Sequence, residues 1–170
     1  GGREFDKQLW REANLTNRED PAGNTVARRD GLQPELAAVG TGSHIDAIPN
    51  ARRFDGTVGV LGGLEAIRAL QRAGFHPKRS IELITFTSEE PTRFGIGCLG
   101  SRLLSGLLDP TAGSQLKDRD GVSLDEARTS AGFSGSLADV ALPPGHYSAF
   151  AELHIEQGPL LEQRQRHHGV

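Results

Sequence analysis

The sequence contains no methionine and only one cysteine, Cys98. A single cysteine cannot form a disulfide within the chain, which excludes the disulfide-stapled class of small secreted domain. The first ten residues have no apolar stretch of the kind found in a signal peptide, so we expect a cytoplasmic protein. Because a complete translation product normally begins with methionine, we also expect a fragment or a processed chain.

The chain also lacks an excess of positive charge and any long apolar run. Lysine and arginine number 19 against 22 acidic residues, which leaves a net charge of −3. A nucleic-acid-binding groove needs clustered basic residues, so we expect no nucleic-acid partner. No segment approaches the roughly 18 consecutive apolar residues of a membrane span, so we expect no membrane partner.

The residues that are present are typical of a globular protein. A chain of 170 residues with 36% hydrophobic and 24% charged residues can form one domain, or part of a larger one. The spacing of apolar residues predicts helices over 4–13, 60–70, 99–107 and 124–131, strands over 25–29, 36–39, 81–87 and 150–154, and a loop over 108–122. In the second helix, Val60, Leu61, Leu64, Ile67 and Leu70 are expected on one face. The alternation of predicted helices and strands along the chain indicates an α/β fold with a largely parallel or mixed sheet flanked by helices.

Side chains that bind metals follow three of the predicted strands. In chain order these are His44 and Asp46, then Glu89 and Glu90, then His154, and a further acid, Asp55, precedes the long helix. Ligands in such sheets gather beyond the carboxyl ends of the strands. Imidazole and carboxylate groups are ligands of zinc, manganese and cobalt. Each segment alone is more typical of a solvated loop, a turn or a core histidine, but their shared place at strand ends favours a metal site.

Spacing within these segments suggests separate roles for neighbouring residues. In an extended loop His44 and Asp46 point the same way, so Asp46 can hydrogen-bond the far nitrogen of a ligand imidazole. The adjacent Glu89 and Glu90 point to different sides, so one can bind metal while the other faces a water molecule. Two adjacent carboxylates also favour a nearby cation.

Other patterns suggest different chemistry. The segment 95–100 matches the G-x-G-x-x-G pattern of a dinucleotide site. However, residues 88–94 separate its first glycine from the strand and carry two acids that would repel a pyrophosphate, so close helix packing is the preferred interpretation. Cys98 is interpreted as a small buried residue rather than a nucleophile. His76 and His146 lie in turn contexts and are expected to face solvent.

Three long segments resemble one enzyme family. They are GSHIDAIPNARRFDGTVGVLGGLEAI, FTSEEPTRFGIGCLGSRL and ELHIEQGPLLE. Their order and spacing resemble the dinuclear metal amidohydrolases of the hydantoinase/carbamoylase type, which act on ureidoglycolate, allantoate or N-carbamoyl-L-amino acids. The segment TSEEPTRFGIGCLGSR, with GVSLDEARTSAGF downstream, is most similar to the ureidoglycolate branch.

The resemblance implies a mechanism and a role for each matching side chain. It implies two divalent metal ions, Mn²⁺ or Zn²⁺, with His44 and His154 on one ion, Glu90 on the other, Asp55 bridging both, Glu89 as general acid and base, Asp46 orienting His44, and Gln157 contacting substrate. A metal-bridging water would lose its proton to Glu89, and the hydroxide would attack the ureido or amide carbonyl. The substrate would be a small ureido or carbamoyl compound, and a carbamoyl group would leave as ammonia and carbon dioxide.

Family members are more than twice as long as this chain. The resemblance therefore implies that residues 1–170 are the N-terminal part of an incomplete metallopeptidase-like catalytic domain. A lid domain, through which the parent protein would form a homodimer, and a C-terminal return segment would be absent. Two alternatives stay open: an inactive, truncated metal-binding remnant, and a nucleotide-binding module built on residues 95–100.

Overall fold

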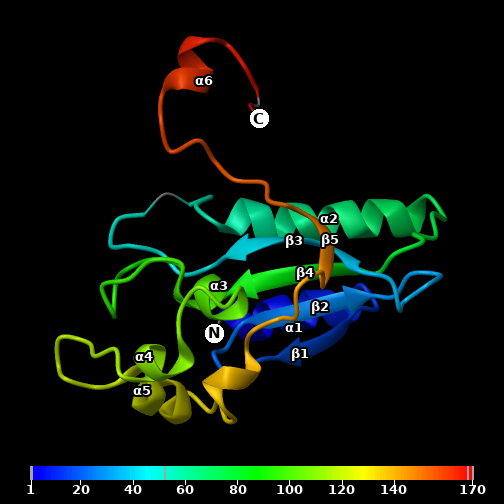
Figure 1. Cartoon of the computed structure of the whole chain (residues 1–170). Coiled ribbons are helices and arrows are strands. Elements are labelled where there is room, and N and C mark those ends of the chain that lie inside the picture. The colour runs from blue at the N-terminus through cyan, green and yellow to red at the C-terminus, as the bar shows by residue number, and fades with distance from the viewer. Residues whose placement is uncertain (1, 52, 168, 170) are drawn as a thin grey trace.

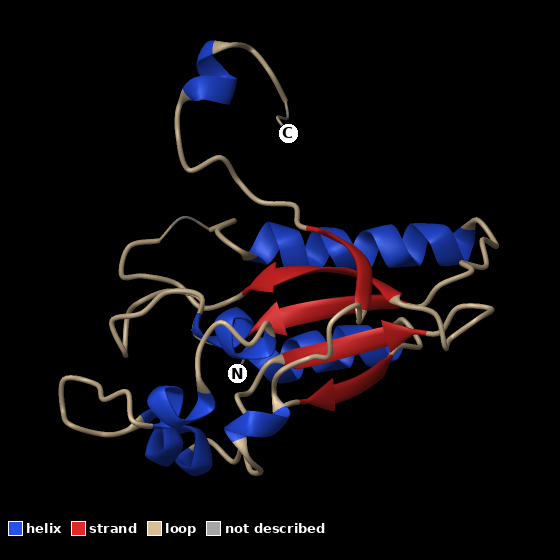
Figure 2. Cartoon of the chain, viewed as in Figure 1, coloured by secondary structure: helices blue, strands red, loops and turns tan. Residues whose placement is uncertain are grey.

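The computed structural model describes residues 2–51, 53–167 and 169 of the chain (Figures 1 and 2). Its elements are α1 (Gly2–Glu12), β1 (Thr16–Glu19), β2 (Thr25–Arg29), β3 (Ala38–His44), α2 (Thr57–Arg72), β4 (Ile81–Phe86), α3 (Leu99–Leu104), α4 (Pro110–Ser114), α5 (Leu124–Ser130), the 3₁₀ turn η1 (Leu137–Asp139), β5 (Tyr147–Ala151) and α6 (Leu160–Gln163). No helix among the described residues is long and apolar enough to cross a bilayer.

The strands form one mixed sheet in the order β1-β2-β4-β3-β5. β3 pairs in parallel with β4 on one side and with β5 on the other, whereas the β1–β2 and β2–β4 pairs are antiparallel. The predicted mixed α/β fold is therefore confirmed. The three parallel strands end at the same edge of the sheet, so the loops that follow them meet there.

The main core lies between the sheet and the helices α1 and α2. It combines Trp10 and Ala13 with Val60, Leu64 and Ile67 of α2 and with Leu83 of β4. The prediction for the face of α2 was wrong at Leu61, which is 44% exposed. One residue advances the helix by about 100°, so Leu61 faces away from the sheet while its neighbour Val60 is buried.

A second apolar cluster forms beyond the carboxyl ends of the strands. It joins α3, α5, η1 and the segments between them through buried leucines, among them Leu99, Leu103, Leu124 and Leu137. Part of the region predicted as loop, 108–122, is helix α4, whose start is capped by Asp109 accepting amide hydrogen bonds. The short strand β1, with the polar sequence TNRE, was not predicted because it carries no apolar alternation.

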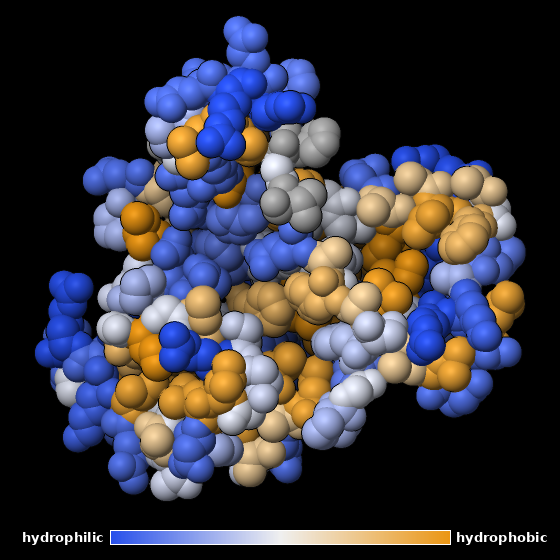
Figure 3. Space-filling model, turned by 45° about the horizontal axis from the view of Figure 1, so that its top comes forward, coloured by the Kyte–Doolittle hydropathy of each residue, from blue (hydrophilic) through white to orange (hydrophobic). Residues whose placement is uncertain are grey.

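The end of the described chain leaves the body of the molecule. β5 is the edge strand beside β3, and its residues are largely exposed. It spans Tyr147–Ala151 rather than the predicted 150–154, so His154 lies three residues beyond the strand. The following segment projects past α2 and contains the short helix α6 (Figure 1). In the space-filling view this projection, at the top, carries both hydrophilic and hydrophobic side chains (Figure 3).

Candidate metal centre

The carboxyl ends of the three parallel strands bring the predicted ligands together. His44 is the last residue of β3 and pairs in register with Phe86, the last residue of β4. Glu89 follows β4 by three residues, and His154 follows β5 by three residues. Parallel pairing therefore gathers side chains that are separated by up to 110 positions in sequence.

The first group consists of His44, Asp55 and His154. One ligand atom from each lies within 4.8 Å of the others. The Nε2 atoms of His44 and His154 lie 3.8 and 3.5 Å from Oδ1 of Asp55, and the two imidazole rings stack with centroids 5.8 Å apart. Two imidazoles and a carboxylate facing one point form a donor set suited to zinc or manganese.

The second group shares His44 and adds the two glutamates. His44, Glu89 and Glu90 also offer ligand atoms within 4.8 Å of one another, and Nε2 of His44 lies 3.5 Å from Oε2 of Glu89. Burial and the nearby charges of Glu89 and Asp55 raise the pKa of Glu90. Carboxylates that repel one another at close range favour a bound cation, because a cation neutralises them.

Asp46 contacts both His44 and the loop that carries Glu89 and Glu90. Its backbone oxygen lies 2.9 Å from Nδ1 of His44, closer than its carboxylate oxygen Oδ1 at 3.6 Å. The carboxylate accepts the backbone N–H groups of Glu89, at 3.3 Å, and of Glu90, at 3.0 Å. The main chain of Asp46 is therefore the nearer partner of the imidazole ring, and its carboxylate accepts both amides of the loop that carries Glu89 and Glu90.

The charges around His44 and Asp46 favour their ionised forms. Burial opposes protonation of His44, but its hydrogen bonds with Asp46 and the charge of Glu89 outweigh burial and raise its pKa to about 9. Burial also opposes ionisation of Asp46, but His44 and the amides of Glu90 and Glu89 outweigh it and lower its pKa. A metal would substitute for the proton as the positive partner of these groups.

Gln157 reaches the same point from the segment that follows β5. Its side-chain Nε2 donates a hydrogen bond of 2.7 Å to Oδ1 of Asp55, the oxygen that faces both histidines. Gln157 has a positive φ of 57°, a backbone conformation that is uncommon for a residue other than glycine. The residue predicted to contact substrate therefore lies beside the carboxylate predicted to bridge the metals.

Gly56, which follows Asp55, makes room for His44. It has a φ of 68°, and a Cβ atom there would lie 2.5 Å from the backbone oxygen of His44 and 2.6 Å from its ring. The sequence suggested a turn or a helix cap, but no side chain caps α2 at this position. Asp55 therefore supplies a carboxylate beside the histidines, and Gly56 allows the backbone to pack against the imidazole of His44.

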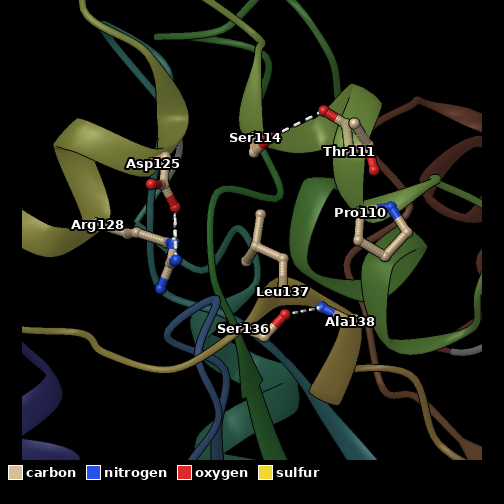
Figure 4. A pocket seen from close by; sticks show the side chains of 8 residues that line it. All are labelled: Pro110, Thr111, Ser114, Asp125, Arg128, Ser136, Leu137 and Ala138. Atoms are coloured by element: carbon tan, nitrogen blue, oxygen red, sulfur yellow. Dashed lines mark hydrogen bonds and ion pairs between the residues drawn. The ribbon is translucent and has the colours of Figure 1, made fainter.

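A pocket of about 500 Å³ opens beside the ligands. Its lining residues are His44, Phe86, Glu89, Cys98, Ser101, Phe150, Glu152 and His154. Sequence reasoning did not single out Phe86, Phe150, Ser101 or Glu152, because the pairing of β3 with β4 and β5, and the attachment of α3 to residues 87–89, bring them together. Figure 4 shows a different pocket, of about 290 Å³, between α4, α5 and η1, where Asp125 and Arg128 pair with each other. The pocket beside the metal ligands is therefore the candidate site.

His146 was predicted to face solvent, and the structure contradicts this. It is half-buried, and its Nε2 lies 2.9 Å from Oε2 of the buried Glu82, which Arg28 and the hydroxyl of Tyr147 also contact. His146 does end a turn, since its N–H donates to the carbonyl oxygen of Pro143, but the prediction that it faces solvent was wrong because pairing of β5 with β3 brings it to Glu82 of β4. His76 is exposed, as predicted.

Comparison with known proteins identifies the family of this chain. Residues 40–170 match the family described as peptidase family M20/M25/M40. The chain is 55% identical over 166 residues to a ureidoglycolate hydrolase of Arabidopsis thaliana, covering 94% of this chain and 35% of the relative. It is 44% identical over 159 residues to an N-carbamoyl-L-amino-acid amidohydrolase of Paenarthrobacter aurescens, covering 93% and 39%.

Solved structures of related proteins have a fold similar to that of this chain. A hydantoinase/carbamoylase family amidase from Burkholderia ambifaria superposes with a TM-score of 0.89 at 38% identity, over 96% of this chain and 40% of that one. The crystal structure of AtUAH in complex with glyoxylate gives a TM-score of 0.90 at 53% identity, again over 96% and 40%. The chain thus spans well under half the length of the proteins that it matches. The resemblance found in the sequence is confirmed, and the chain belongs to peptidase family M20/M25/M40, with the hydantoinase/carbamoylase amidases among its relatives.

Proposed function

We propose that this chain is the metal-binding part of a hydrolase that cleaves a linear C–N bond in a small ureido or amide compound of the ureidoglycolate or allantoate type. The observation that carries the proposal is the convergence of His44, Asp55 and His154 within 4.8 Å at the carboxyl edge of the sheet. The names of the relatives support the bond class. Because an N-carbamoyl-L-amino-acid amidohydrolase is also 44% identical, hydrolysis of carbamoyl amino acids is the second candidate.

The proposal includes a larger protein. Relatives match this chain over only 34% to 40% of their length. We propose that residues 1–170 form the N-terminal part of the catalytic domain, and that a lid and a return segment complete it. This larger protein is called the full-length enzyme below. It is proposed to be a cytoplasmic homodimer that associates through the lid.

The donor set fits two divalent ions of the Mn²⁺ or Zn²⁺ class. His44, Asp55 and His154 would hold one ion, and Glu90 with the shared Asp55 would hold part of the second. The Oδ1 atom of Asp55 faces both histidines, which supports Asp55 as a ligand of the first ion, and its sharing with the second ion is part of the proposal. The ions, when bound, would supply Lewis acidity and make a bound water acidic near neutral pH.

Glu89 is the proposed proton carrier. Its Oε2 lies 3.5 Å from Nε2 of His44, so the carboxylate faces the ligand cluster as well as the pocket. It would accept the proton of the attacking water and then deliver it to the leaving nitrogen. Gln157 would contact the substrate, and Asp46 would keep His44 and the glutamates in register through the hydrogen bonds described above.

Assays of the full-length enzyme with Mn²⁺ test the proposal. Ureidoglycolate, allantoate and N-carbamoyl amino acids are supplied separately, and ammonia release is measured. Turnover of a ureido substrate with loss of activity in the His154→Ala variant supports it, and preference for a carbamoyl amino acid selects the second candidate. Metal binding without turnover of any of these substrates identifies an inactive remnant.

A further inference from the structure

The glycine-rich segment 95–100 lies directly against the loop that carries Glu89 and Glu90. Three successive backbone amides, at Cys98, Leu99 and Gly100, donate hydrogen bonds to the carbonyl oxygens of Glu89, Ser88 and Thr87, at 2.6, 3.1 and 3.0 Å. The start of α3 is thereby fastened to the end of β4. We call residues 87–90 the glutamate segment.

The opposite side of the glutamate segment is held by Asp46, whose carboxylate accepts the amides of Glu89 and Glu90. Ser88, between these attachments, has a φ of 47°, a conformation that a serine seldom adopts unless its surroundings impose it. The glutamate segment is therefore clamped from two sides in a defined geometry.

The close approach explains the last glycine of the motif. A Cβ atom on Gly100 would lie 2.2 Å from Oδ1 of Asn24 and 2.6 Å from the carbonyl oxygen of Thr87. Any larger residue would separate α3 from the glutamate segment. Close packing against the acidic loop thus accounts for Gly100, whereas Gly95, the first glycine of the pattern, has a positive φ of 69° and no atom within 4 Å of a Cβ position.

The side chain of Cys98 extends this clamp to the carboxylate itself. Cys98 precedes α3 with a φ of 58° and does not cap the helix with its side chain. Its Sγ instead lies 3.3 Å from Oε1 of Glu89. The other oxygen of Glu89, Oε2, is the one that faces His44. Both Cys98 and Glu89 line the pocket of about 500 Å³.

We propose that Cys98 is a positioning residue for Glu89: its thiol donates to Oε1 and so holds Oε2 toward the metal ligands and the reacting water. This inference rests on the proposed function of Glu89 as proton carrier. A thiol is a weak donor, so it restrains the carboxylate without neutralising its basicity. Oε1 of Glu89 thereby accepts the positioning hydrogen bond, and Oε2 is the oxygen that accepts the proton.

Kinetics of the full-length enzyme give the first test, with Cys98→Ala, Cys98→Ser and Ser105→Ala. Loss of one modest hydrogen bond is expected to lower kcat of Cys98→Ala by about 3- to 10-fold, with KM and metal content nearly unchanged. Cys98→Ser retains a donor and should recover most of the lost kcat. Ser105→Ala removes a hydroxyl at the far end of the same helix, which donates to the backbone oxygen of Arg102, and serves as the control.

Wild-type kcat in Cys98→Ala would overturn the inference, and so would a Cys98→Ser variant no better than Cys98→Ala. A change confined to KM or to metal content would also overturn it, because positioning of a proton carrier acts on kcat.

Thiol alkylation in the 170-residue chain gives a second test that needs no enzymatic activity. Burial and the hydrogen bond to Glu89 raise the pKa of the Cys98 thiol. Without added metal, Glu89→Gln should therefore speed alkylation by iodoacetamide at pH 8 by about 3- to 10-fold. Glu90→Gln removes the same charge one residue away and should leave the rate nearly unchanged.

Equal rates in the wild type and both variants would overturn the contact between Cys98 and Glu89. A confirmed contact in a full-length enzyme that turns over none of the substrates would instead refute the proposed function. The two failures are therefore distinguishable.

Discussion

Glu89 and Glu90 are adjacent in sequence but differ in their surroundings. In the full-length enzyme, Glu89→Gln is expected to lower turnover by at least about 100-fold while keeping metal content, since the amide retains the shape but cannot accept a proton. Glu90→Gln should instead lower occupancy of the second metal, because an amide is a poorer cation ligand. Metal analysis together with activity assays of the two variants distinguishes these two effects. Metal loss in Glu89→Gln with full metal content in Glu90→Gln would reverse the assignment.

Asp6 gives a stability prediction away from the site. It lies in α1 at 6% exposure, and burial raises its pKa to about 6 from 3.8, against a hydrogen bond from Thr85. The folded state therefore binds the proton more tightly than the unfolded state, so stability is fully present below about pH 4 and is lost as pH rises through about 6.

The Asp6→Asn variant of the chain tests this prediction. The uncharged amide should raise the free energy of unfolding at pH 7 by about 1 to 3 kcal/mol and change it little at pH 4. Urea unfolding at the two pH values measures the difference. An equal effect at both pH values would show that the asparagine acts through packing rather than through charge.

At the scale of elements, the junction between the loop and α2 depends on one glycine. Gly56→Ala is expected to destabilise the chain by about 1 to 2 kcal/mol from the positive φ. A further cost of about 1 to 3 kcal/mol is expected from collision with His44. The displaced imidazole should also weaken Mn²⁺ binding.

Gly74→Ala is the matched control for that substitution. Gly74 has a φ of 65°, close to that of Gly56, but nothing lies within 4 Å of the position that a Cβ atom would take there. The Gly74→Ala variant should lose only the stability that the positive φ costs, and its Mn²⁺ affinity should be unchanged. Urea unfolding and calorimetric titration measure both effects, and equal metal affinities in the two variants would argue against close packing of Gly56 on the ligand.

Prediction of the elements from sequence succeeded where the apolar pattern was strong. The run IELITFT, 81–87, was predicted as a strand, and its first six residues form β4, with Leu83 in the core. β3 was predicted over 36–39 but spans Ala38–His44, because its second half, GTGSH, has no apolar pattern. Gly42 is needed there, since a Cβ would lie 2.0 Å from the backbone oxygen of Ile84. Such a requirement depends on the neighbouring strand and not on local sequence.

At the scale of the whole molecule, the chain should bind one divalent ion better than two. In the proposed site, His44, Asp55 and His154 would provide three ligands for one ion, whereas Glu90 and the shared Asp55 would provide two for the other. Titration of the 170-residue chain with Mn²⁺ by calorimetry should show one dominant site that is lost in His154→Ala. Two sites of equal affinity would contradict this prediction.

The isolated chain is also expected to turn over substrate slowly or not at all. Without the proposed lid and the remaining ligand of the second ion, it lacks part of the substrate positioning and charge stabilisation, which commonly cost several powers of ten in rate. Comparison of the purified chain with the full-length enzyme on the same ureido substrate measures the difference. Comparable kcat values would show that residues 1–170 contain all the catalytic groups.

The sequence by itself determined the α/β class and placed His44, Glu89 and His154 near strand ends, because apolar periodicity and residue type are local properties. Tertiary structure alone decided the strand order β4-β3-β5, which places His154 beside a histidine 110 positions earlier. It also decided that the carboxylate of Asp46 holds the glutamate amides and that Cys98 contacts Glu89. These contacts depend on pairing between distant segments and on close approaches that only glycine permits, and neither leaves a periodic pattern in the chain.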